Sequence, residues 1–234
     1  MKQKVLITGA SRGLGYFLTK RYLEEGDTVF AGAREVSAPK LCELKKEYPE
    51  TLCIVELEVT DTNSTITAAK MVGQYTDKLD IIINNAAIHG QSSFEILEKT
   101  DLDECLTVYD VNSIGPVRIV KAFLSFIRNN EHSKIINISS ESASIGTCKR
   151  DKEFDYCMSK AALNMGTKLL SNYLKKDQAI VLAVHPGWMR TDMGGSNAHL
   201  DPYETACKLV DLFEQINDID HPVFIDNKGE VYPW

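Results

Sequence analysis

A tyrosine and a lysine four residues apart form a pair suited to proton chemistry. Tyr156 and Lys160 are expected on one face of a helix, because residues at this spacing lie one turn apart. A nearby ammonium favours the phenolate, so we expect Lys160 to lower the pKa of Tyr156 from its reference value of about 10. A phenol with a pKa nearer neutrality is a good proton donor to a developing alkoxide. The pair therefore indicates general acid–base chemistry.

The spacing alone is weak support, because Tyr16 and Lys20 repeat it. We interpret that second pair as an ordinary contact on a helix surface, worth about 0.2–0.5 kcal/mol. Tyr156 differs in its surroundings, since a serine-rich strand end precedes it and a long amphipathic segment follows it. The serines of this strand end are Ser139, Ser140, Ser142 and Ser144.

A glycine-rich turn near the start of the chain could bind phosphate. The stretch Thr8-Gly9-Ala10-Ser11-Arg12-Gly13-Leu14-Gly15 follows a short apolar run and precedes a helical pattern. Glycine permits a tight turn and a close approach of the backbone to a pyrophosphate, which the free N–H groups of a helix start attract. Such turns can also serve only packing. The position after the first strand favours a dinucleotide site, and three residues between Gly9 and Gly13 differ from the usual fingerprint.

The residues at the end of the second apolar run indicate whether the dinucleotide is NAD or NADP. An acidic residue there would bind the ribose 2′-hydroxyl of NAD and repel the 2′-phosphate of NADP. Here the chain reads Phe30-Ala31-Gly32-Ala33-Arg34. Arg34 and Arg12 can both pair with a phosphate dianion, although either alone could be a solvated surface residue. Together they favour NADP(H).

Short apolar runs alternate with longer amphipathic stretches along the whole chain. We predict strands at 5–8, 28–31, 52–57, 79–84, 134–139, 179–185 and 222–225, and helices at 13–26, 38–48, 63–76, 101–130, 153–176 and 202–216. This alternation predicts the α/β class, a doubly wound Rossmann-type parallel sheet of about seven strands with helices on both faces. No linker or repeat divides the chain, so residues 1–234 are expected to form a single domain. Residues 193–202, rich in Gly, Ser and Asn, are expected to form a mobile loop at the substrate.

Bulk properties exclude several classes of partner. The formal net charge of −7 argues against nucleic acid and anionic membranes, and no apolar run is long enough to span a bilayer. Six cysteines show no Cys-x-x-Cys and no zinc-like grouping with the five histidines, so no metal is expected. Scattered thiols are typical of a reduced, cytoplasmic protein.

Several motifs together resemble one family. The series Thr8-Gly9-x-x-x-Gly13-x-Gly15, Asn84-Asn85-Ala86, Asn112, Ser140 and Tyr156-x-x-x-Lys160 resembles that of the short-chain dehydrogenases/reductases over nearly the whole chain. Residues 185–195 and 226–234 further resemble the sniffer and C-factor branch of carbonyl reductases. The resemblance implies hydride transfer between NADP(H) and a carbonyl or alcohol substrate. It also implies a homodimer or homotetramer through the long helices near 101–130 and 153–176.

The resemblance implies a role for each matching residue. Tyr156 is the expected acid/base. Ser140 is the favoured residue to hold the substrate oxygen, with Ser139, Ser142 and Ser144 as competing candidates. Lys160 is expected to bind the nicotinamide ribose, and Asn112 to hold a water in a proton relay. Cofactor contacts are expected from Gly9, Ser11, Arg12, Gly13, Leu14, Gly15, Arg34, Glu58, Val59, Asn85, Ala86, Tyr156, Lys160, Pro186, Gly187, Met189 and Thr191. Of these, Glu58 and Val59 should border the adenine, Asn85 the adenosine ribose, and Met189 and Thr191 the carboxamide and pyrophosphate.

Three features depart from the family pattern. Ala87 replaces a glycine, Glu58 replaces an Asp or Asn, and Ser140 and Tyr156 are sixteen residues apart where thirteen is common. We expect the extra residues to form a surface loop within 147–155. Trp188, residues 89–94 and the 193–202 loop are expected to wall the substrate pocket.

Three functions compete on this sequence. The favoured function is an enzyme that reduces aldehydes or ketones. A sensor or signalling protein of the same fold could bind NADP(H) with little turnover, but it would not need Ser140, Tyr156, Lys160 and Asn112 together. A nucleotide-fold methyltransferase leaves those residues unexplained.

Overall fold

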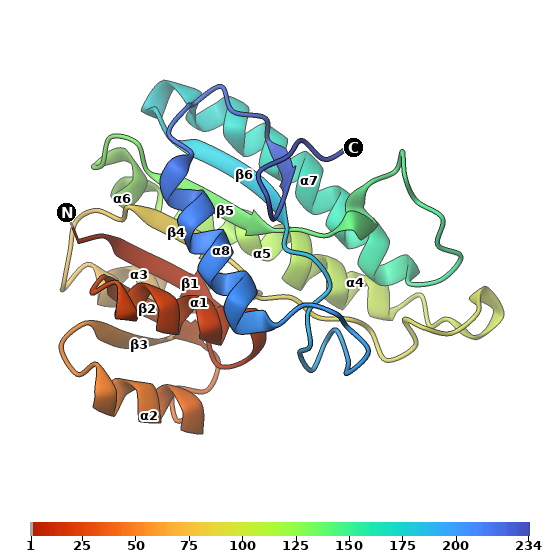
Figure 1. The fold of residues 1–234 in the computed structure, drawn as a ribbon, viewed down its shortest axis with the longest axis horizontal. Helices are drawn as coiled ribbons and strands as arrows, with labels where there is room; N and C mark the ends of the chain where they lie inside the picture. The colour runs from red at the N-terminus through yellow and green to blue at the C-terminus, as the bar shows by residue number, and fades with distance from the viewer. Residues whose placement is uncertain (1) are drawn as a thin grey trace.

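The alternating pattern folds into one parallel sheet, as a computed structural model describing residues 2–234 shows (Figure 1). The seven strands lie in the order β3-β2-β1-β4-β5-β6-β7, and every neighbouring pair is parallel. Their bounds are β1 Lys4–Thr8, β2 Thr28–Ala33, β3 Leu52–Glu56, β4 Ile81–Asn84, β5 Lys134–Ile138, β6 Ile180–His185 and β7 Phe224–Asp226. The predicted fold class, a doubly wound parallel sheet, is confirmed.

Helices cover both faces of the sheet. The α-helices are α1 Gly13–Glu24, α2 Pro39–Glu47, α3 Thr62–Val72, α4 Glu104–Tyr109, α5 Gly115–Ala122, α6 Leu124–Arg128, α7 Phe154–Leu174 and α8 Pro202–Gln215. Short 3₁₀ turns lie at Leu97–Lys99 (η1), Glu141–Ala143 (η3) and Lys175–Asp177 (η4), and a π-helical turn at Asp110–Ile114 (η2). In residues 2–234 no helix is long and apolar enough to cross a membrane.

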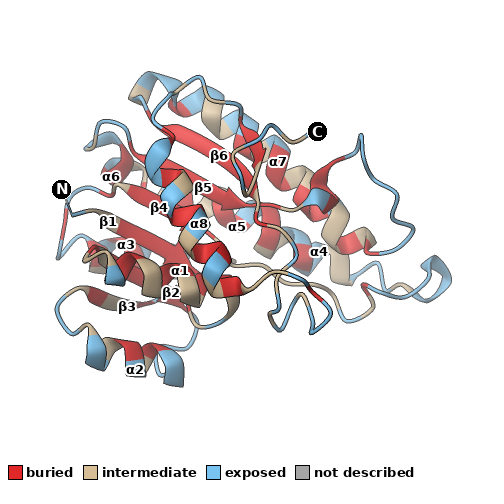
Figure 2. Cartoon of the chain, viewed as in Figure 1, coloured by how far each residue is buried: buried red, intermediate tan, exposed pale blue. Residues whose placement is uncertain are grey.

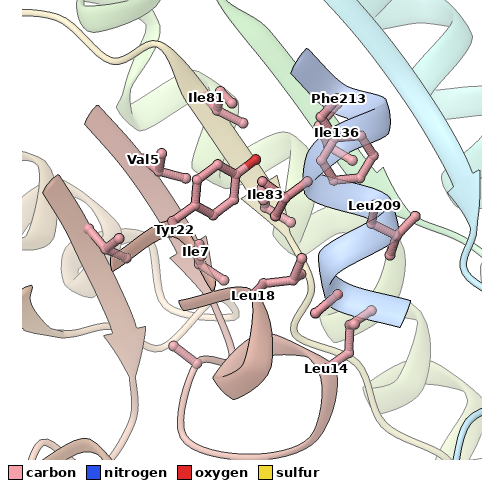
Figure 3. Packing of buried hydrophobic residues seen from close by; sticks show 14 of the residues in the cluster. Val5, Ile7, Leu14, Leu18, Tyr22, Ile81, Ile83, Ile136, Leu209 and Phe213 are labelled. Carbon is pink, nitrogen blue, oxygen red and sulfur yellow. The ribbon is translucent and has the colours of Figure 1, made fainter. Parts of the chain in front are cut away.

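Two hydrophobic layers hold the helices to the sheet (Figure 2). Successive side chains of a strand point to opposite faces, so Val5 and Ile7 of β1 enter one layer and Leu6 enters the other. The first layer, with α1, α2 and α8, contains Leu18 and Phe213 (Figure 3). The second layer is formed with α3, α5, α6 and α7. Burial on both faces explains why the strands are apolar throughout.

The predicted helix over residues 101–130 was wrong as a single element, because the chain forms α4, η2, α5 and α6 in succession. Pro116 has no N–H and cannot donate to the carbonyl of Asn112, four residues earlier. The chain accommodates this in the π turn, where the N–H of Gly115 donates to the carbonyl of Asp110. A second break follows at Phe123, with φ −101° and ψ 16°.

Strand order reverses between β1 and β4, since β2 and β3 lie to one side of β1 and β5 to β7 lie beyond β4. Ligands of open α/β sheets bind outside the carboxyl ends of the strands at such a switch point. The glycine loop follows β1 there, and Asn84-Asn85 ends β4 there. The sheet thus brings the two candidate motifs to one edge.

Candidate active site

Hydrogen bonds join the ends of β1 and β4. The hydroxyl of Thr8 accepts from the N–H groups of Asn85 at 3.0 Å and Ala86 at 3.1 Å. The Asn85 side-chain amide donates to the carbonyls of Thr8 and Gly9. Both N–H groups of this amide therefore hold the loop. Only its Oδ1 is left for the adenosine ribose, where the sequence predicted a contact for Asn85.

The glycine loop has a shape that only glycine allows. Gly9 and Gly13 have φ of +67° and +54°, a left-handed conformation that L side chains rarely adopt. A Cβ at Gly9 would lie 2.9 Å from Cα of Ala86, and one at Gly15 would overlap the carbonyl oxygen of Gly9. No side chain caps the start of α1, and its first turn has no acidic residue. Uncapped N–H groups on a bare backbone fit the pyrophosphate of a dinucleotide.

Two candidate arginines lie exposed beside this loop. The side chain of Arg34 is 74% exposed, and its Nε is 3.9 Å from Glu58. Arg12 is also exposed and contacts Asp192 at 3.3 Å. Exposed ion pairs contribute about 0–1 kcal/mol, so either arginine can exchange its partner for a phosphate dianion at little cost.

A cavity of about 320 Å³ opens next to Arg12. Lys40 and Arg190 line it together with Gly13 and Thr191, and two carboxylates, Asp192 and Asp201, line it as well, so three basic and two acidic side chains lie beside the glycine loop. Ser11 is partly exposed in the loop, while the side chain of Leu14 is buried in the core, so Leu14 offers a ligand its backbone alone.

Glu58 and Val59 differ in how they could reach an adenine. Glu58 is partly exposed, and its carboxylate accepts from the backbone and hydroxyl of Thr60. Val59 is buried against Gly115 of α5, and its carbonyl accepts from Arg118. The side chain of Val59 thus packs in the second hydrophobic layer.

Ser140 is the second residue after β5 and has a hydroxyl available for chemistry. Its Oγ accepts from the N–H of Ser142 at 3.1 Å, which caps the η3 turn. Hydrogen bonding from Ser140 also favours the phenolate of Tyr156. The Ser140 side chain is therefore a neighbour of Tyr156.

The competing serines are placed less well. Ser139 is buried and donates to Asn164 at 2.6 Å, and Ser144 is buried and donates to the Trp234 carbonyl. Ser142 is buried, and hydrogen bonding from its hydroxyl acts on the thiol of Cys157. The contacts around Tyr156 thus favour Ser140.

Tyr156 and Lys160 share one face of α7, with Nζ of Lys160 5.5 Å from the centre of the Tyr156 ring. Lys160 is fully buried, and its ammonium donates to the Ile138 carbonyl at 2.8 Å. Among the residues that the structure describes, this is its one hydrogen-bond partner. Burial lowers the pKa of Lys160 to about 7. Two unpaired donors at the end of β5 fit the hydroxyls of a ribose.

The expected lowering of the Tyr156 pKa does not occur in the protein alone. Burial raises it to about 12, and this effect exceeds that of Ser140. The physical reason is that the same burial removes water from the phenolate and weakens the charge of Lys160.

Asn112 lies buried in the π turn and holds the neighbouring backbone. Its amide donates to the Ile88 carbonyl and to Ser159 Oγ, and its Oδ1 accepts from the Ile88 N–H. These bonds occupy the side chain that the sequence assigned to a relay water. The carbonyl of Asn112, which Pro116 cannot serve, is the group left for that role.

A closed loop after β6 brings the last candidate residues beside the glycine loop. Gly187 has φ of +88°, and Pro186 before it is buried. Met189 pairs with Leu200, which closes the loop at its base. A Cβ at Gly13 would meet Thr191 at 3.7 Å, and the hydroxyl of Thr191 accepts from the N–H of Gly194.

Comparisons with known proteins agree with this fold. The model of the short chain dehydrogenase family matches residues 3–200. The chain belongs to this family. The NADPH-bound carbonyl reductase from chicken fatty liver is similar over 100% of this chain and 99% of its own, with a TM-score of 0.90 and 31% identity. The carbonyl reductase Sniffer of D. melanogaster is similar over 100% of both chains, with a TM-score of 0.93 and 27% identity.

A signalling protein is also similar. The C-signal of Myxococcus xanthus is 29% identical over 159 residues, which cover 68% of this chain and 95% of C-signal. Family membership makes the chain a short-chain dehydrogenase/reductase, an oxidoreductase. Its resemblance to the sniffer and C-factor branch, predicted from the sequence, is confirmed.

In this dehydrogenase Tyr16 and Lys20 each contact other residues, so the expected contact between the two is not the one that forms. Lys20 lies 3.8 Å from Glu24 and over the ring of Tyr203, while Tyr16 has Lys40 over its ring. In residues 2–234 no cluster of three or more His, Cys, Asp or Glu could hold a metal ion.

Sequence reasoning missed a polar network beside Tyr156. His89 stacks on Tyr156, Ser93 contacts His89, and Asp155 accepts from Ser93. Residues 147–152 form the expected surface loop, but Asp155 is buried. From the sequence, a carboxylate such as Asp155 at the start of a helix is expected to be exposed to solvent. No local spacing links it to Ser93, which is 62 residues away.

Proposed function

We propose that this dehydrogenase is an NADP(H)-dependent carbonyl reductase, which transfers hydride between the nicotinamide and a carbonyl or alcohol substrate. The observation that carries the proposal is that Ser140 neighbours Tyr156, which shares one face of α7 with the buried Lys160. The NADPH-bound carbonyl reductase of chicken, similar over the whole chain, supports it.

The side chains have distinct tasks in carbonyl reduction. The bound cofactor supplies the hydride to the carbonyl carbon. Ser140 and Tyr156 donate hydrogen bonds to the carbonyl oxygen, and Tyr156 gives up its proton as the alkoxide forms. A pKa of about 12 keeps the phenol protonated near neutral pH, which suits a donor to the more basic alkoxide. Lys160 offers its free donors to the nicotinamide ribose and, when protonated, stabilises the phenolate.

The two exposed arginines support NADP(H) over NAD(H). Arg34 directly follows β2 and is exposed. Arg12 lies in the glycine loop and lines the cavity together with Lys40 and Arg190. An NADP(H) preference favours the reductive direction. We infer aldehydes, ketones or quinones as the substrate class. Trp188, residues 89–94 and the 193–202 loop are the proposed walls of the pocket.

A sensor of NADP(H) with little turnover is the second candidate, favoured by the similarity to C-signal. A sensor needs the glycine loop and the arginines but not the proton donor. For either function we propose a single domain over residues 1–234, a cytoplasmic location and a homodimer or homotetramer.

Tyr156→Phe tests the proposal in a turnover screen of aldehydes, ketones and quinones with NADPH. The ring still packs but cannot donate a proton, so turnover should fall by about 10²–10⁴-fold while NADPH affinity stays nearly unchanged. Tyr16→Phe is the matched control and should change little. Equal losses in both variants indicate a folding defect rather than lost chemistry. Absence of wild-type turnover with intact NADPH binding favours the sensor.

A further inference from the structure

A histidine lies face to face with the proposed acid. The rings of His89 and Tyr156 have centroids 4.1 Å apart and planes inclined by 21°. His89 also contacts the ring of Phe94, at 5.3 Å between centroids. A phenol covered on one face has fewer directions in which to turn its hydroxyl. The position of His89 therefore bears on the geometry of proton transfer.

Hydrogen bonding determines which nitrogen of His89 carries the proton. Nδ1 lies 3.3 Å from the hydroxyl oxygen of Ser93, and that hydroxyl donates to Asp155 Oδ1 at 2.7 Å. A serine hydroxyl has one hydrogen, and here the carboxylate receives it. Ser93 can then only accept from His89. The neutral imidazole is thus the Nδ1–H tautomer, with its lone pair on Nε2.

The backbone on both sides of His89 is fixed. Asp155 accepts from the N–H of Gly90 at 2.7 Å, and the Asn112 amide holds Ile88. A Cβ at Gly90 would meet the carboxylates of Glu104 and Asp155, so the segment fits closely between them. Because Asp155 directly precedes Tyr156, the network ties His89 to the same helical turn that holds the acid.

We propose that His89 is a positioning residue for Tyr156: held as the Nδ1–H tautomer by Ser93 and Asp155, its ring directs the phenolic hydroxyl to the substrate oxygen. This role rests on the proposed reductase function. His89 acts through Tyr156, so its removal affects the chemical step more than substrate binding. Misplacement of a reacting group by about 1 Å can cost about 100-fold in rate. We expect about a tenfold loss of kcat with KM changed less than about threefold.

Charges around His89 give the role a signature in pH. Glu153 and Asp155 favour the imidazolium, Lys160 and Arg150 oppose it, and burial, the largest influence, lowers the pKa of His89. Glu104 faces the neighbouring Gly90, and its carboxylate accepts from Ser92. His89 is therefore neutral near pH 7 and gains a proton only as the pH falls below its ordinary pKa of about 6.5.

Protonation should disturb the neutral network. The imidazolium carries a hydrogen on Nε2 as well as on Nδ1 and is repelled by Lys160, so the geometry in which the neutral ring holds Tyr156 is lost. The wild-type kcat should accordingly fall on the acidic side of neutrality.

The test uses His89→Phe, which keeps a flat ring without Nδ1–H, and Ser93→Ala, which removes the hydroxyl that joins Nδ1 to Asp155. Both are compared with His132→Asn, a substitution at an exposed position with φ of 70°, where asparagine is tolerated. We measure kcat and KM against pH, with NADPH and the carbonyl substrate turned over fastest in the screen. His89→Phe should lower kcat and abolish the acidic decline, while His132→Asn should leave both unchanged. An unaltered kcat and pH profile in His89→Phe would overturn the proposal and leave the reductase function standing.

A second readout does not depend on turnover. In protein labelled with ¹⁵N-histidine, the His89 signals, assigned by their loss in His89→Phe, should show protonated Nδ1 and bare Nε2 at neutral pH. Ser93→Ala should shift the population towards Nε2–H. Protonated Nε2 with bare Nδ1 in the wild type would refute the network even if no carbonyl substrate were reduced.

Discussion

Lys160 places a cation in a buried position with one carbonyl as its partner in the part of the chain described by the structure. Burial removes the hydration of the ammonium, which lowers its pKa from 10.5 to about 7. A buried ionisable side chain with a strongly shifted pKa is typical of a functional site. The hydroxyls of a bound ribose would supply the missing partners, so cofactor binding should restore charge to Lys160.

Lys160→Met should stabilise the protein without cofactor at acidic pH. The folded pKa of about 7 lies below the unfolded value, so the unfolded state binds more protons between about pH 7 and pH 10.5. Wild-type stability therefore rises with pH across this window. Denaturant unfolding at pH 6 should find the variant more stable by roughly 1–3 kcal/mol, since loss of the bond to Ile138 offsets part of the gain.

This advantage of Lys160→Met should shrink towards pH 10. Lys20→Met, on the surface of α1, serves as the control and should show no such dependence. A wild type whose stability relative to Lys160→Met is the same at both pH values would contradict the buried cation.

Arg34→Asp should reverse the choice between NADPH and NADH. A charge-assisted hydrogen bond contributes about 1.5–3 kcal/mol, so NADPH affinity should fall by about one to two orders of magnitude while NADH affinity stays equal or improves. Paired nucleotide-fluorescence titrations measure this, and the preference should shrink as salt rises.

Glu58→Gln is the matched variant for the same site. Glu58 lies 3.9 Å from Arg34 and competes with the phosphate, so its neutral amide should strengthen NADPH binding. If the wild type binds NADH as tightly as NADPH, Arg34 is a solvated surface residue and the preference has another origin.

The glycine loop and α1 show what a single element contributes. The loop is packed against the end of β4 so closely that the side-chain amide of Asn85 and the carbonyl of Gly9 fill the space beside Gly15. No side chain caps the start of α1, so its first backbone N–H groups are available to bind phosphate.

Gly15→Ala should weaken NADPH and NADH alike, in contrast to Arg34→Asp. The added methyl forces the loop away from β4, and we expect affinity for both nucleotides to fall at least about tenfold, with a stability loss of about 1–3 kcal/mol. Calorimetric titration and thermal unfolding measure the two effects. Gly166→Ala in α7 is the control, since its Cβ meets only Val117 at 3.6 Å and should be tolerated. Unchanged binding in Gly15→Ala would show that phosphate does not approach this loop.

Elements with strong periodicity were predictable, and the breaks within them were not. The apolar runs identified all seven strands within a few residues, because parallel strands buried on both faces are apolar at nearly every position. The sequence of α4 to α6 predicts one amphipathic helix, although Pro116 already showed that one helical hydrogen bond to the carbonyl of Asn112 cannot form. Tyr156, Lys160 and Ser140 could be found from spacing and strand ends. The network of His89, Ser93 and Asp155 could not, because it depends on residues that only the tertiary fold brings together.

At the scale of the whole molecule, α4 and α7 pack together and leave apolar side chains on their outer surface. Those with the largest exposure include Leu106, Met158, Met165, Leu169 and Tyr173. Met158, Met165 and Leu169 follow one side of α7, at separations of seven and four residues. Large contiguous apolar surfaces on a folded protein usually mark an interface.

The double variant Met165→Glu with Leu169→Glu should convert the proposed homodimer or homotetramer to a smaller species. Two carboxylates per chain cannot be buried in an apolar interface without a large desolvation cost. Light scattering at micromolar concentration gives the mass, and Ile66→Glu on α3 is the control outside this surface. A monomeric wild type would refute the interface.

The central claim is that the chain moves hydride from NADPH to a carbonyl carbon with Tyr156 as the acid. The most direct measurement is label transfer from NADPH carrying deuterium at both C4 positions of the nicotinamide, with the alcohol product analysed by mass spectrometry. The wild type should place one deuterium on the carbinol carbon. Tyr156→Phe should bind NADPH with similar affinity and yield at least about 100-fold less labelled alcohol. If both proteins bind NADPH and neither forms labelled alcohol from any aldehyde, ketone or quinone, the chain is a sensor and the reductase account is wrong.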